Sequence, residues 1–76
     1  MTHLPSLSGP SVIELLLGIG FVEVRRSRGS HVQLAHPDGR RVTVPDHGAT
    51  PIGRGLLRKI LRDAKISLGD FQLLLH

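Results

Sequence analysis

The amino-acid sequence predicts an α+β fold in which one helix, a three-stranded antiparallel sheet, a second helix and a short C-terminal helix follow one another. Apolar residues recur at helical spacing in residues 9–20 and 53–64. Between these two segments, three short stretches alternate apolar and polar residues, and turns containing glycine separate them. The chain has 76 residues, which suits one modest core, so we expect a single domain over residues 1–76.

The first helix begins after Ser8, because a serine followed by glycine and proline is typical of a helix start. Ile13 and Leu17 extend its apolar surface around a second side, which belongs either to the core or to a partner site. Gly20 suits the left-handed residue that closes a helix. The stripe predicted to face the core has the spacing i, i+3, i+4 and i+7 and consists of Val12, Leu15, Leu16 and Ile19.

The first strand is expected over residues 21–26, and it turns through residues 27–29. Val22 and Val24 alternate there with charged residues, so we expect both valines on a buried face of the sheet. The strand would then expose its charged side chains on the opposite face.

The second strand is expected over residues 31–36. Its valine and leucine take one face and His31 takes the other, so His31 is predicted to point away from the core, while His36 falls on the opposite parity. The Pro-Asp-Gly sequence at residues 37–39 predicts a reverse turn. A third strand over residues 41–44 would then pair antiparallel to the second.

The second helix is expected from about residue 53 to residue 64, with one apolar and one basic side. Cations in a row on one helical face, with no acid interleaved on that row, favour contact with a polyanion over simple solvation. The apolar side consists of Leu57, Ile60, Leu61 and Ala64. The basic stripe consists of Arg54, Arg58, Arg62 and Lys65, with Lys59 beside it.

A short final helix is expected after Ser67, because Ser67 and Asp70 have the spacing of a capping box. Two amphipathic helices can cover one face of a three-stranded sheet and leave the other face, with His31 and Gln33, toward solvent. This is the layout of a double-stranded-RNA-binding-type fold.

Composition limits the classes of function. Lysine and arginine number ten against six aspartate and glutamate residues, and the formal charge of +4 favours polyanions or an acidic partner. The chain has no cysteine, which excludes a disulfide framework and a thiolate zinc site. Two phenylalanines are its only Phe, Trp or Tyr residues, which argues against base stacking on an aromatic sheet. No apolar run is long enough to span a bilayer, so we expect a cytoplasmic location and no membrane contact.

Several motifs, in this order along nearly the whole chain, resemble those of the HicA-type toxins, which are small RNA-cleaving members of toxin–antitoxin pairs. One departure is the uncharged face at Leu15, Leu16 and Leu17, where relatives often carry lysine or glutamate. It points to closer reliance on a partner or to self-association. The resembling motifs are Gly20-Phe21, Arg28-Gly29-Ser30-His31, His36-Pro37-Asp38-Gly39-Arg40, Val42-Thr43-Val44-Pro45 followed by His47, and Gly55-Leu56-Leu57-Arg58-Lys59-Ile60-Leu61.

The resemblance implies a double-stranded-RNA-binding-like fold, a metal-independent mRNA endonuclease that needs no cofactor, and a HicB-type antitoxin as partner. It also implies that the histidine after Gly-Ser, here His31, is catalytic. The imidazole of His31 suits this role, because it can take a proton near neutral pH. It would remove the proton from a ribose 2′-hydroxyl. The leaving 5′-oxygen would be protonated by His47 or by water.

The residues predicted to bind RNA are Arg28, Ser30, Arg54, Arg58, Lys59 and Arg62. Two alternatives to the nuclease remain, namely a plain RNA-binding module and a protein-binding domain that docks an acidic partner. A zinc-dependent hydrolase using His31, His36 and His47 is disfavoured, because strand parity puts His31 and His36 on opposite faces.

Overall fold

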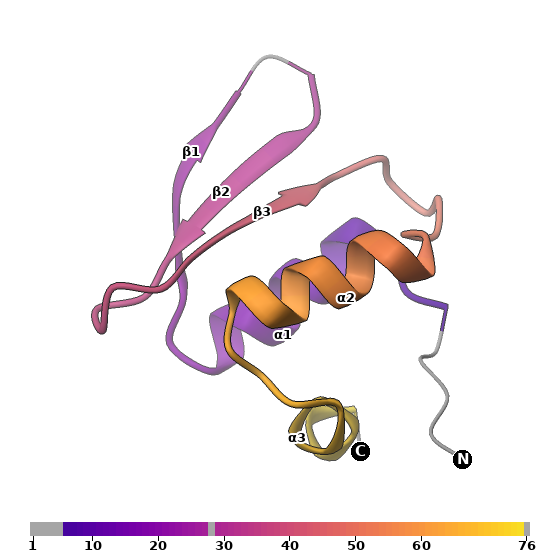
Figure 1. Cartoon of the computed structure of the whole chain (residues 1–76). Coiled ribbons are helices and arrows are strands. Elements are labelled where there is room, and N and C mark those ends of the chain that lie inside the picture. The colour runs from indigo at the N-terminus through magenta and orange to yellow at the C-terminus, as the bar shows by residue number, and fades with distance from the viewer. Residues whose placement is uncertain (1–5, 28, 76) are drawn as a thin grey trace.

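Two helices pack side by side against one face of a three-stranded antiparallel sheet, and a third, short helix lies below them (Figure 1). The computed structural model describes residues 6–27 and 29–75. The strands occur in the order β1-β2-β3. The predicted α+β, double-stranded-RNA-binding-like architecture is therefore confirmed. The elements are α1 (Gly9–Gly18), β1 (Val22–Arg26), β2 (His31–Ala35), β3 (Arg41–Pro45), α2 (Arg54–Asp63) and α3 (Leu68–Leu74).

Helix α1 starts and ends where its sequence predicts. The Ser8 hydroxyl accepts a hydrogen bond from the Ser11 N–H at 3.3 Å, which satisfies one of the free N–H groups at the helix start. Gly20 has φ +103°, and the Phe21 N–H donates to the Leu16 carbonyl at 3.0 Å, so the chain leaves the helix through a left-handed glycine. This turn delivers Phe21 into the core, where 3% of its surface is exposed.

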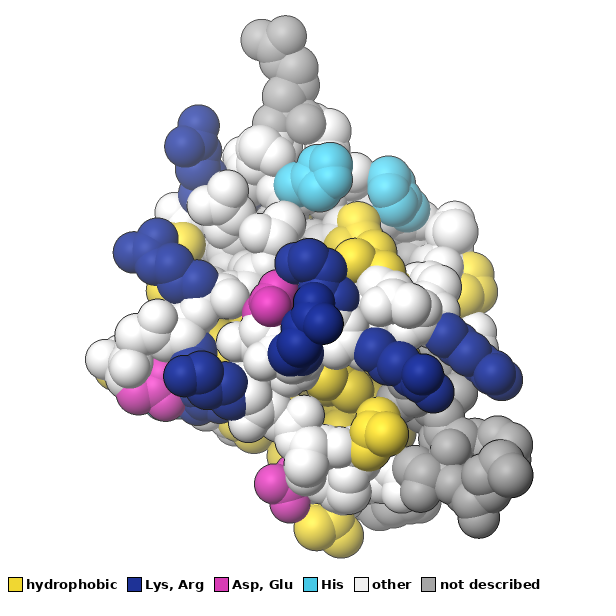
Figure 2. Space-filling view, in the orientation of Figure 1, with side chains coloured by type: hydrophobic (Ala, Val, Ile, Leu, Met, Phe, Trp, Pro, Cys, Tyr) yellow, Lys and Arg dark blue, Asp and Glu magenta, His cyan; other side chains and the backbone are white. Residues whose placement is uncertain are grey.

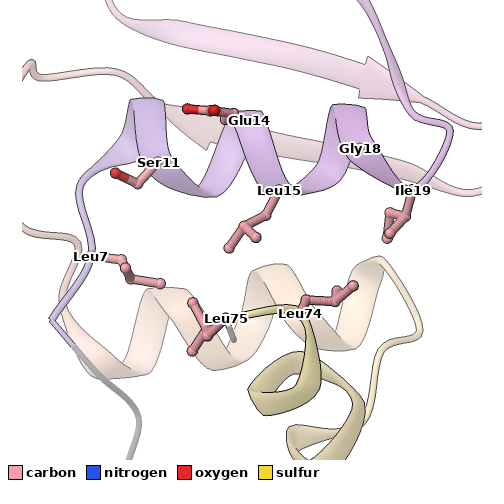
Figure 3. A pocket seen from close by; sticks show the side chains of 8 residues that line it. All are labelled: Leu7, Ser11, Glu14, Leu15, Gly18, Ile19, Leu74 and Leu75. Atoms are coloured by element: carbon pink, nitrogen blue, oxygen red, sulfur yellow. The ribbon is translucent and has the colours of Figure 1, made fainter.

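The core lies between the helices and the covered face of the sheet. It consists of Val12, Ile13, Leu16, Phe21, Val32, Leu34, Val42, Val44, Leu57, Ile60, Leu61, Ala64 and Phe71. Helix α1 is rotated from the predicted stripe, because Ile13 is buried while Leu15 and Ile19 lie at the margin. These two residues face Leu74 and Leu75 across a shallow hollow between α1 and α3 (Figure 3).

Strand β1 contradicts the prediction of one buried apolar face. Val22 and Val24 are each 55% exposed, and all five residues of the strand are exposed. The register pairs Val22 with Ala35 on the open face, whereas Glu23 and Arg26 share the face of the buried residues of β2. A bulge between Glu23 and Arg25 shifts the alternation. β1 is an edge strand that extends beyond the helices, so neither of its faces is covered (Figure 1).

Helix α3 begins at the predicted cap, because the Ser67 hydroxyl accepts a hydrogen bond from the Asp70 N–H at 3.0 Å. It inserts Phe71 into the core, where only 2% of the surface of this residue is exposed. Leu73 on the same helix is 72% exposed. None of the helices in residues 6–27 and 29–75 is long and apolar enough to cross a membrane.

Candidate functional site

His31 is the first residue of β2, and it lies on the face of the sheet that the helices leave uncovered. Its side chain is exposed, whereas Val32 and Leu34 on the same strand are 0% and 1% exposed. The neighbouring residue on β3 is Pro45. Strand parity predicts this direction for His31, and the structure agrees with it.

Hydrogen bonds from both sides fix the backbone around His31. The Ser27 N–H and hydroxyl donate to the His31 carbonyl at 2.9 and 3.2 Å. The Asp46 N–H donates to the Ser30 carbonyl at 2.6 Å. Gly29 has φ +91°, the left-handed conformation that glycine adopts without a steric cost. Arg28, which was predicted to bind RNA, lies outside the described residues.

A hollow of about 440 Å³ lies beside His31, and we call it the His31 hollow. It is lined by His31, Thr43, Pro45, His47, Thr50, Pro51, Ile52, Gly53, Leu56 and Lys59. The loop between β3 and α2 supplies His47, whose Nε2 lies 3.4 Å from the hydroxyl of Ser30. The fold thus brings two imidazoles and one ammonium group, from three separate segments, to a single exposed hollow.

The predicted RNA-binding cations of α2 divide into two groups. Lys59 lines the His31 hollow, and its Nζ is 2.8 Å from Asp63 Oδ2, one turn further along the helix. Arg54, Arg58 and Arg62 are exposed but do not line the hollow. Figure 2 shows Lys and Arg side chains on the same face of the molecule as histidine side chains. These arginines therefore lie outside the His31 hollow, on the exposed surface of the helix that carries Lys59.

Two further arginines, Arg25 and Arg41, lie on the open face and were not among the predicted site residues. The register pairs Arg25 with Gln33 and Arg41 with Ala35, and strand parity puts Gln33 and Ala35 on the same face as His31. Both arginine side chains are exposed. The alternation in β3, where Val42 and Val44 face the core, could have revealed the direction of Arg41. The bulge in β1 concealed the direction of Arg25.

His36 has a structural role away from the His31 hollow. Its Nδ1 accepts a hydrogen bond from the Asp38 N–H at 3.2 Å, which leaves Nε2 to donate to the Ile19 carbonyl at 3.2 Å. The ring also packs edge-on against Phe21, with centroids 5.1 Å apart. These contacts tie the turn between β2 and β3 to the end of α1. His36 thus lies at the opposite end of β2 from His31.

An ion pair links β1 to the loop that carries His47. Arg26 Nη1 lies 2.9 Å from Asp46 Oδ2, and the Gly48 N–H donates to Asp46 Oδ1 at 3.1 Å. The hydrogen bond from Arg26 is the main cause that lowers the pKa of Asp46 below its usual range. The same bond raises the pKa of Arg26. The charged form of Asp46 therefore holds this loop beside Ser30.

We expect this ion pair to make stability fall in acid. Because the folded state lowers the pKa of Asp46, its contribution is present above the ordinary value of about 3.9 and is lost as the pH falls through the lowered value. Wild type should therefore have a higher melting temperature than Asp46→Asn at pH 7, and the difference should shrink below about pH 4. Thermal unfolding followed by circular dichroism measures both curves.

The matched control removes the other partner of the pair. Arg26→Gln should lower the melting temperature at pH 7, and adding Asp46→Asn to it should cost less than Asp46→Asn costs in wild type. Asp38, whose pKa is also lowered, is present in every variant. Its titration therefore affects all the melting temperatures alike and cancels in the differences between them. A constant difference between wild type and Asp46→Asn from pH 7 to pH 3 would contradict this prediction.

Comparison with known proteins supplies the family. A search of the curated proteins gives no match. The family model described as the HicA toxin of bacterial toxin-antitoxin matches residues 9–66, which is well over half of the chain. The match spans α1, the whole sheet, the loop with His47, and α2. The chain therefore belongs to the HicA family of toxins from toxin–antitoxin systems.

Proposed function

We propose that this toxin is a metal-independent endoribonuclease that cleaves mRNA with His31 as general base. The observation that carries the proposal is the exposed imidazole of His31, fixed at the start of β2 and facing a hollow that also contains His47 and Lys59. A base must be within reach of the proton that it takes, and an exposed side chain on an open sheet can approach an RNA backbone. An mRNA target would put this reaction in the cytoplasm.

The proposed reaction is an internal transfer at phosphorus. His31 takes the proton of a ribose 2′-hydroxyl, and the 2′-oxygen forms a bond to the adjacent phosphorus. The bond from phosphorus to the 5′-oxygen of the next nucleotide breaks, and that oxygen takes a proton from His47 or from water. The products are a 2′,3′-cyclic phosphate and a 5′-hydroxyl. His31 returns its proton to solvent, and His47, where it is the donor, takes one back from solvent.

Cations around the site would stabilise the charge that develops on the phosphate oxygens. Lys59 is the ammonium group in the hollow itself. Arg28 is the cation nearest to His31 in the sequence. Ser30 would position the RNA backbone through its hydroxyl. Arg54, Arg58 and Arg62 would hold phosphates further along the strand, as exposed cations on one helix do in sequence-independent binding.

The toxin–antitoxin family implies an antitoxin partner for this chain. We propose that this partner is of the HicB type, as the resemblance of the motifs implies. Co-expression of a HicB-type protein is then expected to suppress the growth arrest that the toxin causes.

The products of the purified toxin test the proposed reaction. An end-labelled RNA should be cut in the presence of EDTA and leave a 2′,3′-cyclic phosphate, whereas an all-deoxy strand of the same sequence should remain intact. Loss of cleavage on addition of EDTA would favour a metal-dependent hydrolase. Binding of RNA without cleavage would favour a non-catalytic RNA-binding module, for which the basic surface of α2 and the open sheet would suffice.

A further inference from the structure

We propose that the His31 hollow binds the base of the nucleotide whose 2′-hydroxyl is attacked, so that the toxin selects RNA in which this nucleotide is unpaired. This inference rests on the proposed function and adds to it a base-binding subsite. The apolar lining of this subsite consists of Leu56, Pro45, Pro51 and Ile52.

The lining of the hollow contains both polar and apolar side chains. His31, His47 and Lys59 can face a ribose and its phosphates, while the prolines, Ile52 and Leu56 offer an apolar surface. Leu56 is 40% exposed, although Leu57 beside it is fully buried, so Leu56 is an apolar side chain that α2 presents to solvent within a basic surface. Apolar surface next to cations matches a nucleotide, which joins an apolar base to an anionic backbone.

The size of the hollow fits the same ligand. Its volume of about 440 Å³ falls within the range of small-molecule sites, yet it opens directly onto the exposed face of His31. The base is attached to the carbon next to the one that bears the 2′-hydroxyl. A ribose within reach of His31 can therefore place its base against Leu56, which lines the same hollow.

The chemistry also requires the nucleotide to leave a helical stack. In-line attack needs the 2′-oxygen opposite the bond that breaks, and in an A-form duplex the 2′-oxygen lies to one side of that line. The attacked nucleotide must rotate, so its base loses stacking on its neighbours. Proteins that read RNA replace such lost stacking with contacts to the splayed base. The apolar side chains that line the His31 hollow can serve this purpose.

The test uses an RNA duplex with one bulged nucleotide, in which a 2′-deoxy sugar at the bulge prevents cleavage there. Its affinity is measured with the base present and with an abasic bulge, for wild type, Leu56→Ala and Leu73→Ala. Leu73 is a matched leucine, 72% exposed on α3. Removing the base should weaken binding to wild type and to Leu73→Ala about tenfold. Leu56→Ala should lose most of this dependence on the base.

Equal affinity of wild type for the RNA with the bulged base and for the RNA with the abasic bulge would overturn the base subsite. So would a Leu56→Ala variant that loses the same amount of affinity for both RNAs. An all-ribose duplex in the same assay separates this inference from the proposed function. Cleavage at the bulge that is just as fast without the base would leave the nuclease standing and overturn the subsite. Binding that depends on the base and on Leu56, with no cleavage, would support the subsite and overturn the nuclease.

Discussion

Replacing His31 with alanine is expected to slow RNA cleavage by about 10²- to 10⁴-fold, because general bases contribute rate factors of this size. The affinity for RNA should change little, since the cations on α2 and on the open sheet remain. The side chain is exposed, so the free energy of unfolding should stay within about 0.5 kcal/mol of wild type. Cleavage rates, and binding of an RNA in which one 2′-deoxy sugar blocks the cleavage site, check the first two expectations on purified protein.

Two further variants make the His31→Ala result specific. Gln33→Ala removes a polar side chain from the same face of β2, and it should cleave at close to the wild-type rate. His47→Ala decides the source of the second proton, because a large loss assigns that proton to His47 and a small one to water. On induced expression, wild type and Gln33→Ala should arrest growth and degrade a reporter mRNA, whereas His31→Ala should do neither. Wild-type cleavage by His31→Ala would contradict the proposed mechanism.

The order of elements could be predicted because its signals are local. Gly20 marked the end of α1, and its left-handed conformation confirms this. Lys65 has φ +56° just after α2, where a left-handed residue is more often glycine, so no glycine marked the end of that helix. The exposure of both faces of β1 could not be predicted. Alternation shows that a strand has two faces but not whether a helix covers either of them.

The candidate site, too, could be predicted only in part from the sequence. The direction of His31 follows from parity along one strand, and the structure agrees with it. The meeting of His31 with His47 and Leu56 depends on the loop from residue 46 to 53, which returns across the end of β2 and is held there by Asp46. No periodic pattern describes such a loop. The sequence gives one weak indication that Leu56 has a role outside the core, because this residue is apolar but lies off the core-facing stripe of α2.

Replacing Phe71 with alanine is expected to cost about 3–5 kcal/mol of the free energy of unfolding, because the large ring is removed from a closed core. Phe71 is 2% exposed and is among the largest fully buried side chains of the described chain. Stable domains have only about 5–15 kcal/mol in total, and a small domain lies toward the lower end. Urea unfolding followed by circular dichroism should therefore show a Phe71→Ala chain that is barely folded at 25 °C.

Leu73→Ala is the matched control on the same helix. Leu73 is 72% exposed, so this variant should change the free energy of unfolding by less than about 0.5 kcal/mol. Equal effects of the two variants would show that α3 is not part of the cooperative core. Helix α3 lies beyond the residues that the family model matches, yet Phe71 closes the core that supports α2 and the sheet. Loss of toxicity in Phe71→Ala would therefore report unfolding, whereas loss of toxicity in His31→Ala with an unchanged melting curve would report chemistry.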